Sequence, residues 1–188
     1  KKKNPVTMKI DVPFARAYRL MHPRLTVLVT SIGKKGKPNI ITLAWAMPTS
    51  FAPPMVAISV APERHSHDLI SESGEFVVNI PTMEIVTETL FCGRNSGRNC
   101  DKFTETGLTQ IPAKKVCPPL VKECVFHLEC KVVNDVETGD HTVFIGEVVV
   151  ASAEQGTFKD KFNIDKVKPI YHVGGDDFLT LYTGTLNR

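Results

Sequence analysis

The sequence predicts a mainly β protein with short helices, folded as a small Greek-key or split β-barrel. A glycine-rich turn at 33–38 separates two strand-like runs, which is the pattern of an antiparallel hairpin. Two long apolar segments in the second half, 124–132 and 141–153, are joined by the turn Glu137-Thr138-Gly139-Asp140. Long antiparallel pairs with only brief helical stretches between strands favour a barrel over a doubly wound parallel sheet.

The first half of the chain divides into short strands and two short helices. Period-two alternation and flanking turn residues predict strands at 25–32, 39–45, 55–61 and 75–80. Between the last two strands we expect one or two helical turns at 67–72, capped by Ser66. A longer helix is expected from its capping residue Thr82 to Phe91, with Gly93 ending it.

The second half contains the longest predicted strands. In the first of them, apolar residues occupy one face and polar residues the other: Cys124, Phe126, Leu128, Cys130 and Val132 against Glu123, His127, Glu129 and Lys131. We expect the polar face to be exposed to water. The strand 141–153 is apolar on both faces, as expected of a strand buried inside a barrel. Six or so strands are expected to close the sheet.

Length and composition fit one globular domain. The chain has 188 residues, of which 42% are hydrophobic, and it shows no internal repeat and no low-complexity linker. We therefore expect a single domain over 1–188, with an N-terminal arm at 1–23 and a C-terminal tail at 156–188. The formal charge is +3, and Lys1–Lys3 is the only basic cluster outside a glycine-rich loop, so nucleic-acid binding is not expected.

Apolar runs and cysteines indicate the compartment. No apolar stretch is long enough to span a membrane, and the N-terminus lacks the apolar run of a signal peptide, so we expect no membrane association and a cytoplasmic protein. The five cysteines are odd in number and form no C-x-x-C pair, which indicates reduced thiols. Cys124 and Cys130 are expected in the core.

Two segments have the composition of an anion site. The loop from Gly93 to Phe103 combines two glycines with three cationic side chains, and Asp101 can begin a helix there. A solvated surface turn has the same composition. In the second segment, Arg64 stands just ahead of the helix expected to be capped by Ser66, where N–H groups favour a phosphate; a surface ion pair and an ordinary N-cap are the alternatives.

No P-loop and no Rossmann fingerprint occurs in the sequence, so a nucleotide would be held by other means. The second hairpin strand offers a surface for a flat ligand. Asn39 and Trp45 are six residues apart and are expected on one side, with Thr42 on the other. Trp45 is the only tryptophan, and a core role is the alternative. His141 follows the turn into the most buried strand, where it can titrate, donate a proton or close the turn.

Histidines and cysteines suggest two further hypotheses. His65 and His67 would share a face if that segment were extended, and could bind a metal together with His127 or His141. Cys92 and Cys100 flank the glycine-rich loop, where a nearby cation could lower a thiol pKa. No partner thiol lies at redox-motif spacing, and a packing role for Cys92 is favoured.

Several short motifs follow one another in a specific order along the chain. They are Asn39-x-x-Thr42-x-Ala44-Trp45, Pro53-Pro54, Arg64-x-Ser66, Gly74-Glu75-Phe76-Val77-Val78-Asn79, Ser96-Gly97 with Asp101-Lys102-Phe103, Gly139-Asp140-His141 and Gly146-Glu147-Val148. In this order and spacing, the chain resembles the flavin reductase-like, FMN-binding split-barrel family, and its flavoredoxin-type members in particular. The resemblance covers about residues 18–155, with a looser match at 169–182.

The resemblance implies a homodimer of split β-barrels that holds FMN near the subunit interface. It places the flavin ring against 39–50 with Trp45 beside it, and the phosphate near Arg64 and Ser66. Lys102 then reaches toward the flavin or its phosphate tail, and His141 stands at the reactive edge as the catalytic residue. The implied cofactor-binding residues are Asn39, Thr42, Ala44, Trp45, Arg64, Ser66, Ser96, Lys102 and His141.

The resemblance also implies the chemistry. Family members include NAD(P)H-dependent flavin reductases, flavin-linked ferric reductases and flavoredoxins that serve protein partners. We therefore expect an oxidoreductase that moves electrons from a reduced donor such as NADH or NADPH through FMN to free flavin, ferric iron or a protein acceptor. Without a dinucleotide fingerprint, the donor would stack on the flavin itself. A metal-dependent barrel and a non-enzymatic flavin-binding electron-transfer module are the alternatives. The tail is expected to cover the cofactor or to exchange with the partner subunit.

Overall fold

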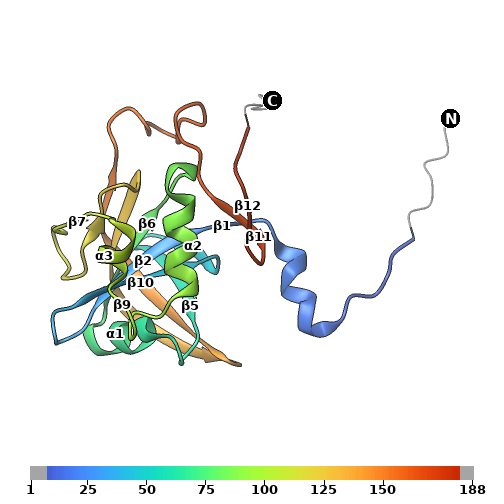
Figure 1. Cartoon of the computed structure of the whole chain (residues 1–188), viewed down its shortest axis with the longest axis horizontal. Coiled ribbons are helices and arrows are strands. Elements are labelled where there is room, and N and C mark those ends of the chain that lie inside the picture. Colours follow the sequence, from blue (N-terminus) through green and yellow to red (C-terminus); the bar gives the residue numbers. More distant parts are fainter. Residues whose placement is uncertain (1–7, 183–188) are drawn as a thin grey trace.

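A seven-stranded antiparallel sheet dominates the computed structural model, which describes residues 8–182. The ranges 1–7 and 183–188, including Lys1–Lys3, lie outside the described residues. The sheet has the order β3-β2-β6-β9-β10-β5-β4 and curls around the core so that β3 also contacts β5 (Figure 1). Its strands are β2 (Val27–Ile32), β3 (Pro38–Leu43), β4 (Ala46–Phe51), β5 (Pro54–Val60), β6 (Glu75–Ile80), β9 (Phe126–Thr138) and β10 (His141–Ala153). The mainly β architecture with short helices is confirmed, with one more strand in the sheet than the six or so expected.

Both predicted hairpins are present. Strands β2 and β3 pair from Val27↔Leu43 to Ile32↔Pro38, around a turn in which Gly36 takes a φ of 73° that favours glycine. Strands β9 and β10 pair along their length with a register shift next to Gly146. A Cβ at Gly146 would lie 2.6 Å from the Phe76 ring, so the sheet approaches that ring closely only because this residue is glycine.

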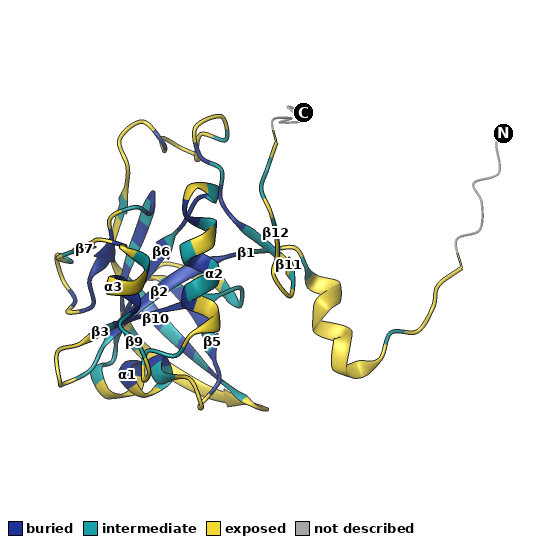
Figure 2. Ribbon diagram, viewed as in Figure 1, coloured by how far each residue is buried: buried dark blue, intermediate teal, exposed yellow. Residues whose placement is uncertain are grey.

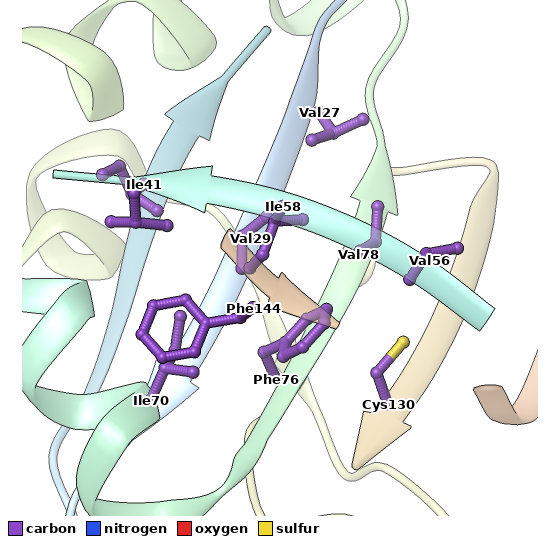
Figure 3. Packing of buried hydrophobic residues seen from close by; sticks show 11 residues of the cluster. Val27, Val29, Ile41, Val56, Ile58, Ile70, Phe76, Val78, Cys130 and Phe144 are labelled. Carbon is purple, nitrogen blue, oxygen red and sulfur yellow. The ribbon is translucent and has the colours of Figure 1, made fainter. Parts of the chain in front are cut away.

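The core lies inside the curled sheet and is closed by α1 (His65–Ser73). Figure 3 shows Phe76 from β6 and Phe144 from β10 next to Ile70 of α1, among branched aliphatic side chains. These three side chains are at most 2% exposed. Each contributes about 1.5–3 kcal/mol through burial, so the sheet and α1 form one stable unit. Cys124 and Cys130 are buried as predicted, and all five cysteines are free thiols.

The helix starts differ from the predictions at two residues. Helix α1 begins after Arg64, and Ser66 lies buried within its first turn instead of capping it, because Ser66 Oγ accepts a hydrogen bond from Asn39 Nδ2 (2.8 Å). Thr82 makes no side-chain cap either; it precedes a 3-10 turn, η2 (Met83–Ile85), and forms a β-bridge to Pro169 of the tail.

The next two helices frame the glycine-rich loop. Helix α2 (Val86–Arg94) continues through Gly93, so this glycine lies within the helix and does not end it. Helix α3 (Lys102–Thr106) does begin at Asp101, whose carboxylate accepts the Thr104 N–H (3.3 Å). The loop therefore lies between two anchored helices.

The polar face predicted for β9 is not exposed to water near the start of the strand. His127 is 8% exposed and Glu129 is 1% exposed, because the segment that contains β7 (Gln110–Ile111) and β8 (Leu120–Val121) covers this face. The Glu129 carboxylate accepts backbone N–H groups of Lys114 (3.0 Å) and Lys115 (2.7 Å). His127 Nδ1 is 2.9 Å from Asn79 Oδ1. Each buried polar group therefore has a partner from the covering segment or a neighbouring strand.

The arm and the tail meet at the edge of the barrel. The arm contains a 3-10 helix, η1 (Phe14–Met21), in which no residue is buried, and it leads away from the barrel (Figures 1 and 2). Strand β1 (Arg24–Leu25) pairs with β11 (Tyr171–Gly174), which pairs in turn with β12 (Asp177–Leu179). Val167 and Ile170 are fully buried and anchor the tail. None of the helices between residues 8 and 182 is both long enough and apolar enough to cross a membrane.

Candidate functional site

Two adjoining hollows lie between the end of β3, the C-terminal end of α2 and the tail. The large cleft has a volume of about 320 Å³ and the small pocket about 110 Å³. They share the lining residues Ile41, Arg64, Gly93 and Arg94, so one leads into the other. The large cleft alone reaches the size of a pocket for a small organic ligand, roughly 300 Å³ or more.

All nine cofactor-binding residues predicted from the sequence line one of these hollows. Asn39, Ser66, Ser96 and Lys102 line the small pocket; Thr42, Ala44, Trp45 and His141 line the large cleft; Arg64 lines both. The glycine-rich loop and the start of α1, far apart in sequence, are thus brought together beside β3.

Close packing shapes the small pocket. Asn39 is 5% exposed and its amide donates to Ser66 Oγ, which holds β3 against α1. Gly97 faces this amide: a Cβ there would lie 2.7 Å from Asn39 Cγ. Arg98 ties the loop to the Glu63 carbonyl just before α1 (2.6 Å) and to the Asp68 carboxylate within α1 (2.6 Å). The close approach of Gly97 to Asn39 and the hydrogen bonds of Arg98 therefore hold the loop in place.

Lys102 is a buried cation in the wall of the small pocket. The residue is 4% exposed, and its Nζ donates to the backbone carbonyls of Ile40 (2.7 Å) and Cys92 (2.7 Å). Burial lowers the pKa of the Lys102 ammonium. An ammonium has three N–H donors, and the two carbonyls take only two of them. One donor is left for an acceptor in the pocket.

His65 supplies a second buried polar atom to the small pocket. Burial, followed by the nearby Arg98 charge, lowers the pKa of His65, so this imidazole is neutral around pH 7. Its Nδ1 is buried and has no hydrogen-bond partner within the described chain. The small pocket thus combines one buried cation with an imidazole atom that lacks a partner.

The floor of the large cleft comes from the end of β3. We expected Thr42 on the opposite side from Trp45, but both line the cleft because β3 ends at Leu43 and the chain turns at Ala44. Asn39 lines the small pocket instead. Thr42 Oγ1 donates to the Thr89 carbonyl of α2 (2.5 Å), which fixes the helix against the strand.

Aromatic and imidazole rings form one wall of the large cleft. Six rings follow one another, with centroids 4.8, 5.8, 6.1, 5.1 and 5.5 Å apart, in the order His141, Trp45, Tyr18, His22, His172 and Phe178. We call this series the ring wall. A wall of ring faces and edges suits a flat ligand. His141 is also fixed by a 2.7 Å contact between its Nδ1 and Asp140 Oδ1, which lowers the pKa of the exposed Asp140 carboxyl.

Sequence reasoning missed four members of the ring wall, which come from the arm and the tail. Tyr18 and His22 precede the first strand, while His172 and Phe178 belong to the tail hairpin β11–β12. For His172 and Phe178 the only signal was the looser family match at 169–182 and the expectation that the tail covers the cofactor, and for Tyr18 and His22 it was their place at the start of the 18–155 resemblance. The pairing of β1 with β11 brings them together.

Polar atoms without partners gather at the two hollows. Five buried side-chain nitrogen or oxygen atoms in residues 8–182 lack a hydrogen-bond partner, and four belong to residues that line a hollow. They are His22 Nε2, Thr26 Oγ1 and Thr89 Oγ1 at the large cleft, and His65 Nδ1 at the small pocket. Leaving a buried polar atom without a hydrogen bond costs about 1–3 kcal/mol of stability. The gathering of four such atoms at the two hollows therefore indicates a place for a polar ligand.

The structure does not support the metal hypothesis. No group of three or more His, Cys, Asp or Glu residues in the described part of the chain could hold a metal ion. His65 and His67 lie in α1 and not on an extended face; His67 Nε2 contacts Thr142 Oγ1 (2.9 Å), and His127 contacts Asn79. His67 and His127 therefore make separate structural contacts and do not converge on one site.

Cysteine redox chemistry is not supported at Cys92. Burial raises the pKa of the Cys92 thiol to about 11, so the reactive thiolate is scarce at neutral pH. The nearby Lys102 opposes this shift but does not overcome it. Cys92 Sγ is therefore a small apolar packing group, as favoured from the sequence.

Comparison with known proteins agrees with this architecture. A family model described as "Flavin reductase like domain" matches residues 18–175. A flavoredoxin structure from Methanosarcina acetivorans is similar with a TM-score of 0.84 and 29% identity, covering 95% of both chains. The FMN-binding domain of a flavin reductase-like enzyme from Shewanella baltica OS155 has a TM-score of 0.79 and 25% identity, covering 94% of this chain and 96% of that one.

A curated relative adds a named activity. The ferric-chelate reductase (NAD(P)H) of Archaeoglobus fulgidus is 32% identical over 121 residues, which are 62% of this chain and 70% of that protein. The family model spans most of the chain and includes all residues that line the small pocket and all but Asp176 and Phe178 of those that line the large cleft. The chain therefore belongs to the flavin reductase-like family and has its FMN-binding split-barrel fold.

Proposed function

We propose that this protein is an FMN-dependent oxidoreductase that passes electrons from a reduced donor such as NADH or NADPH to free flavin, ferric iron or a protein acceptor. The observation that carries the proposal is the continuity of the two hollows, because a small polar pocket with buried positive charge opens into a cleft walled by rings. FMN has the same two parts, a phosphate and a flat ring system. The polar atoms without partners at both hollows support this fit.

The phosphate would occupy the small pocket. Lys102 and Arg64 provide positive charge there, and Ser66 and Ser96 provide hydroxyl groups. Helix α1 begins at this pocket, and the N–H groups of its first turn favour an anion. Gly97 keeps the loop close enough for its backbone to take part. We assign these groups to binding and orientation of the cofactor.

The flavin ring would lie in the large cleft against Thr42, Ala44 and Trp45. When bound, FMN would supply the hydride and electron-transfer chemistry, while the protein excludes water and sets the orientation of the ring. Asp140 accepts the Nδ1–H of His141, so His141 Nε2 is left to accept or donate a hydrogen bond at the ring edge. We propose His141 as the catalytic residue on this ground.

The electron path is proposed from the relatives. One structural relative is named a flavoredoxin and one curated relative an NAD(P)H ferric-chelate reductase. This chain has no separate dinucleotide motif, so a nicotinamide would stack on the flavin within the large cleft. A flavin-binding electron carrier without turnover of its own is the second candidate, and the flavoredoxin similarity favours it.

We also propose that the protein is a homodimer. Phe14 in η1 is 98% exposed, and Met47 and Phe51 on the edge strand β4 are 61% and 101% exposed. Apolar side chains of this size on an arm and on a sheet edge suit burial against a second copy. Sedimentation equilibrium should give twice the chain mass of 20.8 kDa; a monomer at micromolar concentration would contradict the proposal.

The decisive test is flavin binding followed by reduction. The protein should bind FMN in a 1:1 ratio per chain, and NADH or NADPH should bleach the bound flavin in anaerobic stopped-flow experiments. Turnover with ferric chelate or riboflavin would distinguish the enzyme from the carrier. Failure to bind FMN would contradict the proposal, and bound flavin that stays oxidised with both dinucleotides would contradict its choice of donor.

A further inference from the structure

The tautomer of His22 is fixed by the tail. His22 Nδ1 lies 3.1 Å from the backbone carbonyl oxygen of His172, which can only accept a hydrogen bond. The proton of a neutral His22 therefore sits on Nδ1, and Nε2 carries a lone pair. This Nε2 is buried, has no partner within residues 8–182 and belongs to a residue that lines the large cleft. His22 thus offers a preoriented acceptor.

Thr26 offers the complementary group close by in sequence. The residue is 1% exposed, its Oγ1 has no partner within the described chain, and it lines the same cleft. The Thr26 backbone N–H donates to the Ile170 carbonyl (2.8 Å), so the tail fixes this residue as it fixes His22. A hydroxyl can rotate to donate, so the pair provides one acceptor and one donor.

These two groups are not among the residues assigned to the flavin ring, but they adjoin them, because Thr26 precedes Val27, which pairs with Leu43 at the end of β3. Thr89, Gly93 and Arg94 belong to α2, and the last two also line the small pocket. His22 and Thr26 belong to the strip where the arm meets the tail, beside the rings of Tyr18 and His172. Tyr18 sits on η1, which has no buried residue, so the part of the ring wall that screens His22 is lightly held.

We propose that this arm–tail strip recognises a nitrogen heterocycle that carries a primary carboxamide, namely the nicotinamide or dihydronicotinamide ring of the electron donor. His22 Nε2 accepts the amide N–H, Thr26 Oγ1 donates to the amide C=O, and the neighbouring rings contact the heterocycle. Both are positioning residues for the donor. The proposal rests on the proposed function, because it places the donor beside the flavin.

Two substitutions at His22 separate recognition from structure. His22→Asn keeps a side-chain N–H near the Nδ1 position, where it can still donate to the His172 carbonyl, but has no atom at the Nε2 position. His22→Gln places an amide near the Nε2 position. We expect His22→Asn to raise the KM for NADH about 3- to 10-fold with little change in kcat, and His22→Gln to restore part of the loss.

A ligand analogue tests the same contact from the other side. In 3-acetylpyridine adenine dinucleotide a methyl ketone replaces the carboxamide, so the C=O remains and the N–H donors are absent. The wild-type FMN-loaded protein should bind NAD⁺ several-fold more tightly than this analogue, and His22→Asn should remove that preference. Thr26→Val should weaken binding of both dinucleotides equally, and Thr26→Ser should bind both as the wild type does.

Nitrogen-15 NMR of the histidine rings gives a readout without turnover. The His22 Nε2 resonance should be that of an unprotonated nitrogen and should shift on addition of nicotinamide but not of 3-acetylpyridine. A protonated Nε2 in the ligand-free protein, equal affinity of the wild type for both dinucleotides, or unchanged NAD⁺ binding by His22→Asn would overturn the inference. Failure to bind FMN would instead count against the proposed function, and the resonance test with free nicotinamide would still decide the role of His22.

Discussion

Substitution of Lys102 by methionine tests the phosphate assignment. Methionine keeps the length and apolar stem of the side chain but removes the ammonium. The Ile40 and Cys92 carbonyls then lose their donor, at a cost of about 1–3 kcal/mol each, but removal of a buried charge offsets part of this loss. The free energy of unfolding of the ligand-free protein should therefore fall by only about 1–2 kcal/mol.

Cofactor affinity should fall much further. A hydrogen bond between an ammonium and a phosphate is worth about 1.5–3 kcal/mol, so Lys102→Met should weaken FMN binding about 10- to 150-fold in a fluorescence titration. Riboflavin, which lacks the phosphate, should bind the variant and the wild type alike. The exposed Lys35→Met variant is the control and should bind FMN normally. Equal losses for FMN and riboflavin would refute the reasoning, because Lys102 would then act through structure alone.

The pH dependence offers a second check on Lys102. Burial lowers its pKa in the folded protein, so between that pKa and the unfolded value of about 10.4 the unfolded state binds more protons. The stability of the ligand-free protein should therefore rise with pH across this window. Lys102→Met should lack that rise, which urea unfolding at a series of alkaline pH values would reveal.

Three further substitutions test the packing around the site and the barrel. Gly97→Ala should destabilise the protein by about 1–3 kcal/mol in thermal unfolding and weaken FMN binding, because the new Cβ meets Asn39; normal FMN affinity would contradict this. Glu129→Gln should lower the free energy of unfolding by about 1–3 kcal/mol in urea, because the amide oxygen replaces only one carboxylate oxygen and the N–H₂ in the other position cannot accept a backbone N–H; an unchanged midpoint would show that these bonds contribute little. Burial lowers the pKa of His127, so stability should fall below about pH 6.5 by up to about 1.4 kcal/mol per pH unit. His127→Asn should flatten this acid slope in urea unfolding at pH 5 and 7, and an unchanged slope would assign it to other groups.

Local sequence pattern predicted the bounds of several strands well. The bounds predicted for β6 (75–80) and β10 (141–153) are confirmed, as is the β2–β3 hairpin. The exposure of β9 was wrong, because alternation shows that a strand has a polar face but not which segment covers it. The charge of Glu129 is accommodated by backbone N–H groups, which carry no sequence signal.

The sequence predicted which residues gather at the two hollows better than it predicted how their side chains contact one another there. Motif order grouped Arg64 and Ser66 at the start of α1 with Lys102 of α3, and all three line the small pocket. It missed the contact between His22 and His172, which lie 150 residues apart and meet only because β1 pairs with β11. The sides of β3 were misassigned because Trp45 lies beyond the end of the strand, where period-two alternation no longer applies.

A crystal structure of the protein with FMN bound tests the central claim most directly. The proposal predicts electron density for the phosphate in the small pocket, within hydrogen-bond distance of Lys102, Ser66 or Ser96. It predicts the flavin ring in the large cleft beside Trp45. A phosphate exposed to solvent, or a ring bound on another face of the barrel, would contradict it.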